Sequence, residues 1–247
     1  MVETSMSEPR RRGRMPAVSD ADIRRVARSL LVEQGPDAIT LRAIARELGI
    51  TAPALYRYYE SRDDLVAAVR TDVCADLAKD LEAAIADLPD DAGTRFFAIC
   101  RGFRTWALTH SREFTLVFAS PVTAGITSAM QQFGEPVGRI FLGAAGRLLT
   151  EYEVVTPPLD LIPSELRDDL MKFQTELLAV LADSGQKFPA EKLDLGVSYV
   201  MIQFWARLYG HVTLEVFNNY PIQISHPDVL FDSTLADIGR SIGLVAG

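Results

Sequence analysis

The fold is decided by the stretch Thr40-Leu-Arg-Ala-Ile-Ala-Arg-Glu-Leu-Gly-Ile-Thr-Ala-Pro-Ala-Leu-Tyr-Arg-Tyr-Tyr59. Thr40 is suited to cap a helix, and Gly49 tolerates the left-handed conformation that ends one. Between them, apolar residues recur at the i, i+3, i+4 and i+7 spacing of an amphipathic helix. These residues are Leu41, Ile44, Ala45 and Leu48. The spacing therefore predicts a short helix followed by a tight turn.

A second short helix is predicted after this turn. Thr51 is suited to cap it, and Pro53 falls in its first turn, where a missing amide proton costs little. Ala54, Leu55 and Tyr59 are expected to face the core. The opposite face carries side chains that suit contacts with phosphates and base edges, namely Thr51, Ala52, Tyr56, Arg57 and Tyr58. The order of caps, helices and glycine turn is typical of a helix-turn-helix, and it favours this interpretation over packing aromatics alone.

Residues 19–68 resemble the DNA-binding domain of TetR-family regulators. The resemblance implies that Thr40 and Arg42 approach DNA from the start of the second helix. It also implies that Arg62 holds a phosphate, at a position where the family usually has Lys, which has a different donor geometry. The recognition face is implied to comprise Thr51, Ala52, Pro53, Tyr56, Arg57 and Tyr58. The similarity rests on a first helix at 23–35, on Ala38-Ile-Thr-Leu-Arg-Ala-Ile-Ala45, on Ala54-Leu-Tyr-Arg-Tyr-Tyr59 and on Ser61-Arg-Asp-Asp-Leu65.

The rest of the chain has helical periodicity and almost no period-two alternation. Prolines in Val154-Val-Thr-Pro-Pro-Leu-Asp-Leu-Ile-Pro163 predict a loop there. The expected fold is all-α, with a flexible basic arm at 1–18, a three-helix DNA-binding domain at 19–68 and a larger helical bundle for ligand binding and dimerisation at 69–247. Helices are predicted at 61–88, 94–110, 111–119, 125–150, 164–184, 189–217 and 227–244.

Charge separates the two expected domains. The whole chain has a formal net charge of −8, whereas residues 1–70 carry 12 Arg and 10 Asp or Glu, so the remainder carries −10. An acidic bulk domain repels DNA and helps to orient the basic end toward it. The segment Pro9-Arg-Arg-Arg-Gly-Arg14 is either a solvated tail or a contact to phosphates or a minor groove.

Composition is typical of a globular protein with a sizeable core, since 48% of the 247 residues are hydrophobic. The charged N-terminus lacks an apolar signal region, and no apolar run is long enough to span a membrane. We therefore expect a cytoplasmic protein without a membrane partner. Cys74 and Cys100 are expected as small apolar core residues; a redox switch is the lesser alternative.

The C-terminal part resembles a TetR subfamily with a WHG-type ligand-binding domain. The segments Phe103-Arg-Thr-Trp-Ala-Leu-Thr-His-Ser-Arg-Glu-Phe-Thr-Leu-Val-Phe118 and Trp205-Ala-Arg-Leu-Tyr-Gly-His-Val-Thr-Leu-Glu-Val-Phe217 carry this similarity. Trp205 and Gly210 fit the signature, as do Leu214 and Glu215. Tyr209 stands where a His usually precedes the glycine.

A helical bundle of this size can hold a mostly apolar ligand pocket. Most aromatics at helical spacing are expected to be ordinary core, and a lone His on an apolar helix is typical of a hydrogen-bonded core residue. The candidate ligand-binding residues are Phe97, Phe103, Arg104, Trp106, Met130, Phe133, Tyr152, Gln203, Trp205 and His211.

Motifs for catalysis are missing from the sequence. There is no Gly-rich phosphate loop, no His, Cys and carboxylate set with metal-ligand spacing, and no nucleophile elbow. We therefore expect no catalytic residue, no metal and no cofactor. An architectural DNA-binding protein without a ligand and a helical enzyme are the alternatives.

These observations predict a homodimeric transcription regulator, a repressor that binds a palindromic operator. One recognition helix reads only a few base pairs, so specificity requires two half-sites. The candidate dimer interface comprises the helices at 164–184 and 189–217. A small apolar or aromatic effector is expected to release the DNA, with the helix at 61–88 transmitting the change.

Overall fold

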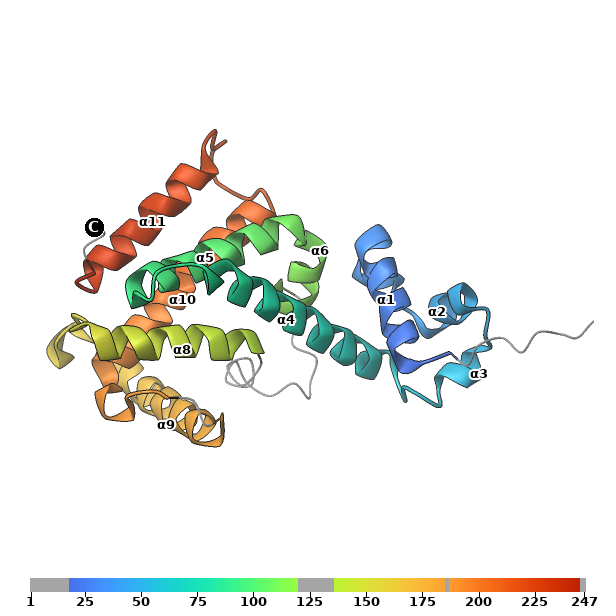
Figure 1. The fold of residues 1–247 in the computed structure, drawn as a ribbon, viewed down its shortest axis with the longest axis horizontal. Helices are drawn as coiled ribbons and strands as arrows, with labels where there is room; N and C mark the ends of the chain where they lie inside the picture. Colours follow the sequence, from blue (N-terminus) through green and yellow to red (C-terminus); the bar gives the residue numbers. More distant parts are fainter. Residues whose placement is uncertain (1–17, 120–135, 185–186, 245–247) are drawn as a thin grey trace, which may run out of the picture. The chain divides into compact units, whose positions relative to one another are not determined.

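The computed structural model describes residues 18–119, 136–184 and 187–244, and every regular element in these ranges is helical (Figure 1). This confirms the predicted all-α class. The chain forms two compact units, and the boundary between them falls between Val66 and Ala67. The basic arm at 9–14 and the candidate ligand residues Met130 and Phe133 lie outside the described residues.

The first unit holds α1 (Asp20–Gln34), the 3-10 turn η1 (Pro36–Ala38), α2 (Leu41–Leu48), α3 (Ala52–Leu55) and the start of α4 (Arg62–Ala86). Its helices bury a compact apolar core, which stabilises so small a unit by removing apolar surface from water. The fully buried side chains of this core include Ile23, Leu31, Ile39, Ile44, Leu55 and Leu65.

Local hydrogen bonds define where these helices begin and end. Thr40 Oγ1 accepts from the backbone N of Ala43 at 3.1 Å, and Gly49 ends α2 with φ +66°, as predicted. Ser19 caps α1, and the hydrogen bonds of Asp22 to Ser19 and Arg25 lower the pKa of Asp22 to about 2. The caps therefore fix the helix starts independently of the core.

The predicted side-chain cap at Thr51 is wrong. Thr51 occupies the N-cap position of α3 without a side-chain cap hydrogen bond. The backbone N of Ala54 donates instead to the carbonyl of Thr51 at 2.9 Å, and Pro53 has no N–H to donate. Pro53 and Ala54 are the second and third helical positions, whose amides a capping side chain bonds, so neither is left for the Thr51 hydroxyl.

The second unit is a bundle in which α10 packs against α5, α9 and α11, while α5 also packs against α8 (Figure 1). Among the described helices, none combines the length and apolarity that crossing a bilayer requires. Besides the rest of α4, the unit comprises α5 (Ala92–Thr109), α6 (Ser111–Phe114), η2 (Thr115–Ala119), α8 (Pro136–Glu151), α9 (Arg167–Ser184), α10 (Leu195–Val216) and α11 (Pro227–Ser241).

Several predicted helices are divided or shortened. The one expected at 111–119 ends after four residues and continues as the π-helical turn η2. That expected at 164–184 opens with the 3-10 turn η4 (Ser164–Leu166), and that at 189–217 with η5 (Ala190–Lys192). Asp194 then caps α10 by accepting from the backbone N of Val197 at 2.8 Å. For η4 and η5, tight turns that directly follow Pro163 and Pro189 explain the breaks.

The loop predicted at 154–163 is confirmed, with one 3-10 turn, η3 (Leu159–Leu161), inside it. Both cysteines are buried, as expected of small apolar core residues. Burial raises the pKa of the Cys100 thiol far above its usual value, which makes this side chain an unreactive core residue.

Candidate DNA-binding surface and apolar cavity

The segment that follows the glycine turn is short. Its helix, α3, has four residues, and a turn carries the chain from Tyr56 to Tyr58. Leu55 is fully buried and Tyr59 is 8% exposed, which confirms that they face the core. The buried side chains of Leu55 and Tyr59 therefore attach residues 52–59, the recognition segment, to the core of the first unit.

Tyr59 also fixes the segment to α1. Its hydroxyl donates to Asp20 Oδ1 at 2.5 Å, and Arg24 bridges the same carboxylate and the Tyr59 hydroxyl. Burial and the bond to Asp20 raise the pKa of Tyr59, so the ring stays a neutral donor. Sequence reasoning assigned Tyr59 to the core without identifying this network, because Tyr59 lies 39 residues from Asp20 and 35 from Arg24.

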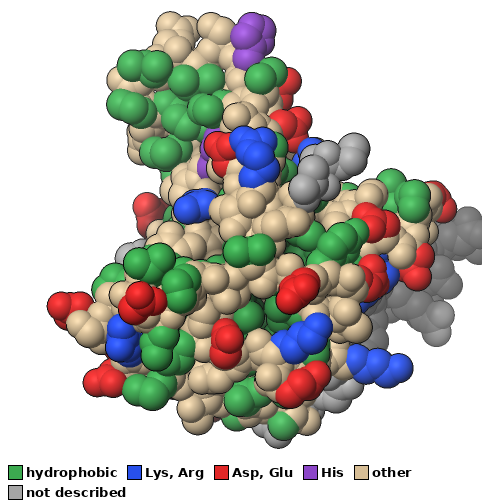
Figure 2. Space-filling view, turned by 90° about the vertical axis from the view of Figure 1, so that its left-hand side faces the viewer, with side chains coloured by type: hydrophobic (Ala, Val, Ile, Leu, Met, Phe, Trp, Pro, Cys, Tyr) green, Lys and Arg blue, Asp and Glu red, His purple; other side chains and the backbone are tan. Residues whose placement is uncertain are grey.

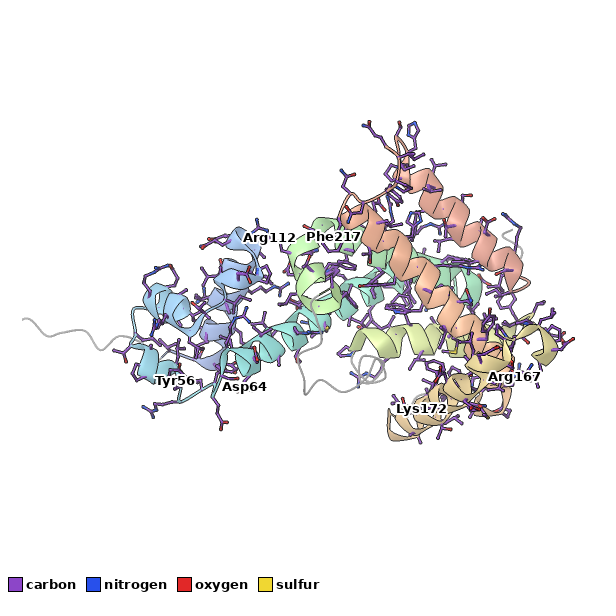
Figure 3. The ribbon with its side chains drawn as sticks, turned by 180° about the vertical axis from the view of Figure 1, so that it is seen from behind. Tyr56, Asp64, Arg112, Arg167, Lys172 and Phe217 are labelled. Carbon is purple, nitrogen blue, oxygen red and sulfur yellow. The ribbon has the colours of Figure 1, made fainter. Side chains whose placement is uncertain are left out.

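The outer side of the segment presents aromatic and cationic groups. Tyr56 (Figure 3) is 57% exposed, and the side chain of Arg57, the next residue, is exposed as well. Tyr58 is exposed, yet its hydroxyl donates to the carbonyl of Val18 at 2.8 Å. The other predicted contacts at Thr40, Arg42, Thr51 and Pro53 are exposed, and Ala52 is half-buried.

Arg62 has a structural role that the sequence did not reveal. Its Nε donates to the carbonyl of Ile39 at 2.7 Å, and its Nη2 donates to that of Pro36 at 2.9 Å. These bonds join the start of α4 to the loop before α2. No local spacing could indicate them, because the partners lie 23 and 26 residues away.

The second unit contains a cavity of about 310 Å³. Its walls come from α5, α8, α9, α10 and α11 and from Val154, and every lining side chain is aliphatic or aromatic. Such a lining favours an uncharged apolar molecule, because a buried polar group would find few partners. The lining includes Phe96, Phe141, Leu142, Ala145, Phe173, Val200, Met201, Phe204, Trp205 and Ile238.

Of the predicted ligand residues that the structure describes, Trp205 alone lies in this lining. Phe103 lies in the core with its ring centroid 6.0 Å from that of Trp205. Phe97 is half-buried against Phe96. Four polar candidates form hydrogen bonds elsewhere: Arg104 with Glu215, Tyr152 with Asp91, Gln203 with Tyr199 and His211 with Tyr220. The ring of Trp106 is stacked on that of His110.

Sequence reasoning missed the lining residues of α8, α9 and α11. An apolar side chain that faces a cavity and one that fills a core have the same helical periodicity. Only the spacing between helices distinguishes them, and periodicity does not report it.

A buried polar cluster lies apart from this lining. Arg104 donates to Glu215, and its guanidinium carbon lies 5.2 Å from the centre of the Phe231 ring. The hydrogen bonds that Arg104 donates to Glu215 raise the pKa of Arg104, whereas burial lowers the pKa of His211. In the part of the chain that the structure describes, no group of His, Cys, Asp or Glu side chains is placed to hold a metal ion.

A helix-turn-helix with an exposed polar and aromatic segment defines a DNA-binding protein class. Comparison with known families agrees with this geometry. Residues 23–69 match the family described as bacterial regulatory proteins, tetR family, and residues 96–238 match the tetracyclin repressor-like, C-terminal domain. The chain belongs to the TetR family.

Its curated relatives are regulators. The HTH-type transcriptional regulators Mb1846 of Mycobacterium bovis and Rv1816 of Mycobacterium tuberculosis are each 30% identical over 225 residues, which cover 87% of this chain and 88% of the relative. The chain is therefore a DNA-binding transcriptional regulator and not an enzyme.

The fold also occurs in solved structures. The crystal structure of the regulatory protein SCO4313 has a TM-score of 0.56 at 23% identity and covers 88% of this chain and 93% of that one. A Rhodococcus sp. RHA1 protein of unknown function has a TM-score of 0.54 at 19% identity, with coverage of 93% and 99%. At these identities the similarity concerns the fold alone.

Proposed function

We propose that this regulator is a repressor that binds a palindromic operator as a homodimer and leaves it when a small apolar molecule binds the second unit. The observation that carries the proposal is the cavity of about 310 Å³ with an entirely aliphatic and aromatic lining, in a chain that also has the helix-turn-helix. A DNA-binding protein without a ligand has no use for such a cavity.

The proposed DNA contacts combine the exposed outer side of the recognition segment with the start of α2. Arg57 is the proposed base-reading residue, since Arg matches the acceptors of guanine, and the hydroxyls of Thr40, Thr51 and Tyr56 are proposed to contact phosphates. The anchoring of Tyr59 on α1 supports a rigid presentation of this face. The full set is Thr40, Arg42, Thr51, Ala52, Pro53, Tyr56, Arg57, Tyr58 and Arg62.

Dimerisation is proposed through the second unit. Large apolar side chains are exposed on α10 at Ile202 and Leu214, and on α11 at Val229 and Leu230. Figure 2 shows hydrophobic side chains gathered in the upper part of one face of the molecule. A second copy of the chain can bury this exposed apolar surface in a symmetric interface. Of the two helices expected in the interface, at 164–184 and 189–217, the proposal retains the second, α10. It adds α11.

The proposed effector is small, uncharged and apolar or aromatic. The cavity lies near the lower end of the volumes of ligand pockets, which run from roughly 300 to 1,000 Å³. Ile202 both lines the cavity and belongs to the proposed dimer surface on α10, so the cavity borders that surface.

The test is a gel-shift titration of the full chain against the DNA upstream of its own gene, with unrelated duplex as competitor at physiological salt. We expect a specific complex at nanomolar protein that contains two protomers, and its loss with an apolar compound from a screen. Equal binding to the competitor would favour an architectural role. Failure of a random-sequence selection to yield any preferred site would contradict the operator.

A further inference from the structure

The π-helical turn η2 is held by side chains from two other helices. Arg70 Nη2 on α4 donates to the carbonyl of Val117 at 2.8 Å, and the hydroxyl of Tyr209 on α10 donates to the carbonyl of Phe118 at 2.8 Å. Successive carbonyls of one turn are thus bound from two directions. Widened turns of this kind are frequent at functional sites.

Tyr209 connects this turn to the wall of the cavity. Its ring is stacked on that of Trp205, with centroids 5.8 Å apart and planes at 15°, and Trp205 lines the cavity. The ring of Phe114, just before η2, lies 6.1 Å from that of Tyr209 and 5.2 Å from that of Phe118. Aromatic packing is therefore unbroken from the cavity wall to the turn.

Arg70 connects the same turn to α4. Its side chain is half-buried, and a charged donor to a carbonyl makes a stronger hydrogen bond than a neutral one. The helix that bears it begins at Arg62, whose guanidinium donates to the carbonyls of Ile39 and Pro36. One continuous helix therefore carries an anchor to η2 and, eight residues earlier, an anchor to the loop before α2.

We infer that Tyr209 and Arg70 are the positioning residues that transmit occupancy of the cavity to α4 through η2. The inference rests on the proposed function, because it requires a molecule in the cavity. An occupant in contact with the Trp205 indole shifts the stacked Tyr209, and the Phe118 carbonyl follows its donor. The adjacent Val117 carbonyl then moves relative to Arg70, so α4 is displaced.

Two variants remove one hydrogen bond each. Tyr209→Phe deletes the hydroxyl but keeps the stacked ring, and Arg70→Met deletes the guanidinium but keeps most of the aliphatic stem. The matched control is Tyr199→Phe, which deletes a hydroxyl on the same helix α10; that hydroxyl accepts from Gln203 at 3.1 Å. All three are made in the full chain.

The probe is N-phenyl-1-naphthylamine, an uncharged aromatic dye whose fluorescence rises in apolar sites. Hydrogen exchange is measured at residues 66–72 of α4 and 115–119 of η2, with and without the dye. In the wild type and Tyr199→Phe, we expect the dye to change exchange in both segments by about threefold or more. In Tyr209→Phe and Arg70→Met, dye affinity stays within about threefold of wild type, while the change in α4 disappears.

The outcomes separate the two levels of the proposal. Suppose that the dye binds and that it changes hydrogen exchange in α4 of Tyr209→Phe and Arg70→Met as much as in the wild type. The transmission through η2 is then overturned, while the proposed effector cavity is supported. Binding to the wild type without any change in α4 overturns it as well. If the wild type does not bind the dye, the proposed effector cavity fails, and the transmission fails with it.

Discussion

Arg104 of α5 donates two hydrogen bonds to the carboxylate of Glu215 on α10, from Nε to Oε2 at 2.7 Å and from Nη2 to Oε1 at 2.5 Å. The two side chains are 16% and 8% exposed. The ring of Phe231 on α11 lies against the guanidinium, so three helices meet at one ion pair. Two parallel bonds fix relative orientation as well as distance.

Loss of this ion pair is expected to lower the stability of the fold. Arg104→Met leaves the Glu215 carboxylate buried without its partner, so the free energy of unfolding should fall by about 3–5 kcal/mol in urea titrations. The control is Arg101→Met on the same helix, because Arg101 and Asp232 form a 2.8 Å pair with both side chains more than half exposed. In that variant the free energy of unfolding should fall by less than about 1 kcal/mol. Equal losses would contradict the structural role of the buried pair.

Arg57→Ala tests the proposed recognition face. We expect operator affinity to fall by about 1–3 kcal/mol, since a bidentate base contact is lost, while the melting temperature stays unchanged because the side chain is exposed. Tyr56→Phe should weaken binding too, through the loss of one hydroxyl. Arg112→Ala, at an exposed arginine on α6 (Figure 3), serves as the control in the same gel shifts. Normal operator binding by Arg57→Ala would overturn the assignment.

Arg62 is expected to serve both stability and DNA binding. Arg62→Ala removes the donors to Ile39 and Pro36 and should cost about 1–3 kcal/mol of stability. It should also lower the salt slope of operator binding by about one phosphate contact. Arg62→Lys separates the two effects, because Lys keeps the charge without the planar fork, so the slope recovers and stability does not. Recovery of neither, or of both, would argue against this division.

His211 is expected to make stability depend on pH. Burial lowers its pKa below the unfolded value of 6.5, with the hydroxyl of Tyr220 at 3.0 Å from Nε2. Below pH 6.5 the unfolded chain therefore binds a proton that folded His211 resists, so stability falls as pH decreases.

His211→Gln should flatten the fall measured by denaturation between about pH 7 and pH 5, by at most about 1.4 kcal/mol per pH unit. His226→Gln, at an exposed histidine, should keep the wild-type slope. Parallel slopes for the wild type and His211→Gln would show that His211 does not carry the dependence.

The helix-turn-helix was predictable because its determinants are local. The cap at Thr40 and the left-handed Gly49 act within one turn of the chain, and Leu55 and Tyr59 follow from helical spacing. The brevity of α3 and the π-helical geometry of η2 were not predictable. Both depend on packing against residues distant in sequence, such as Asp20 for Tyr59 and Arg70 for Val117.

The aromatic residues show the same limit in the second unit. Helical periodicity placed Phe103 and Trp205 inside the bundle, yet it could not distinguish the core position of Phe103 from the cavity wall at Trp205. Likewise, Tyr152 was a ligand candidate by residue type, whereas its hydroxyl donates to Asp91 at 2.5 Å. The residue type determines which groups a side chain is able to bind. The packing of the neighbouring helices determines which of those groups lies within its reach.

By itself, the sequence determined the all-α class, the order of the two short helices around Gly49 and the contrast in charge between the two ends of the chain. These properties depend on composition and on spacings of a few residues, for which helix geometry and backbone sterics are sufficient. Only the tertiary structure decided that Arg62 binds carbonyls, that Arg104 pairs with Glu215 and that α8, α9 and α11 complete the cavity. Those relationships join residues far apart in the chain, and they are set by how whole helices pack.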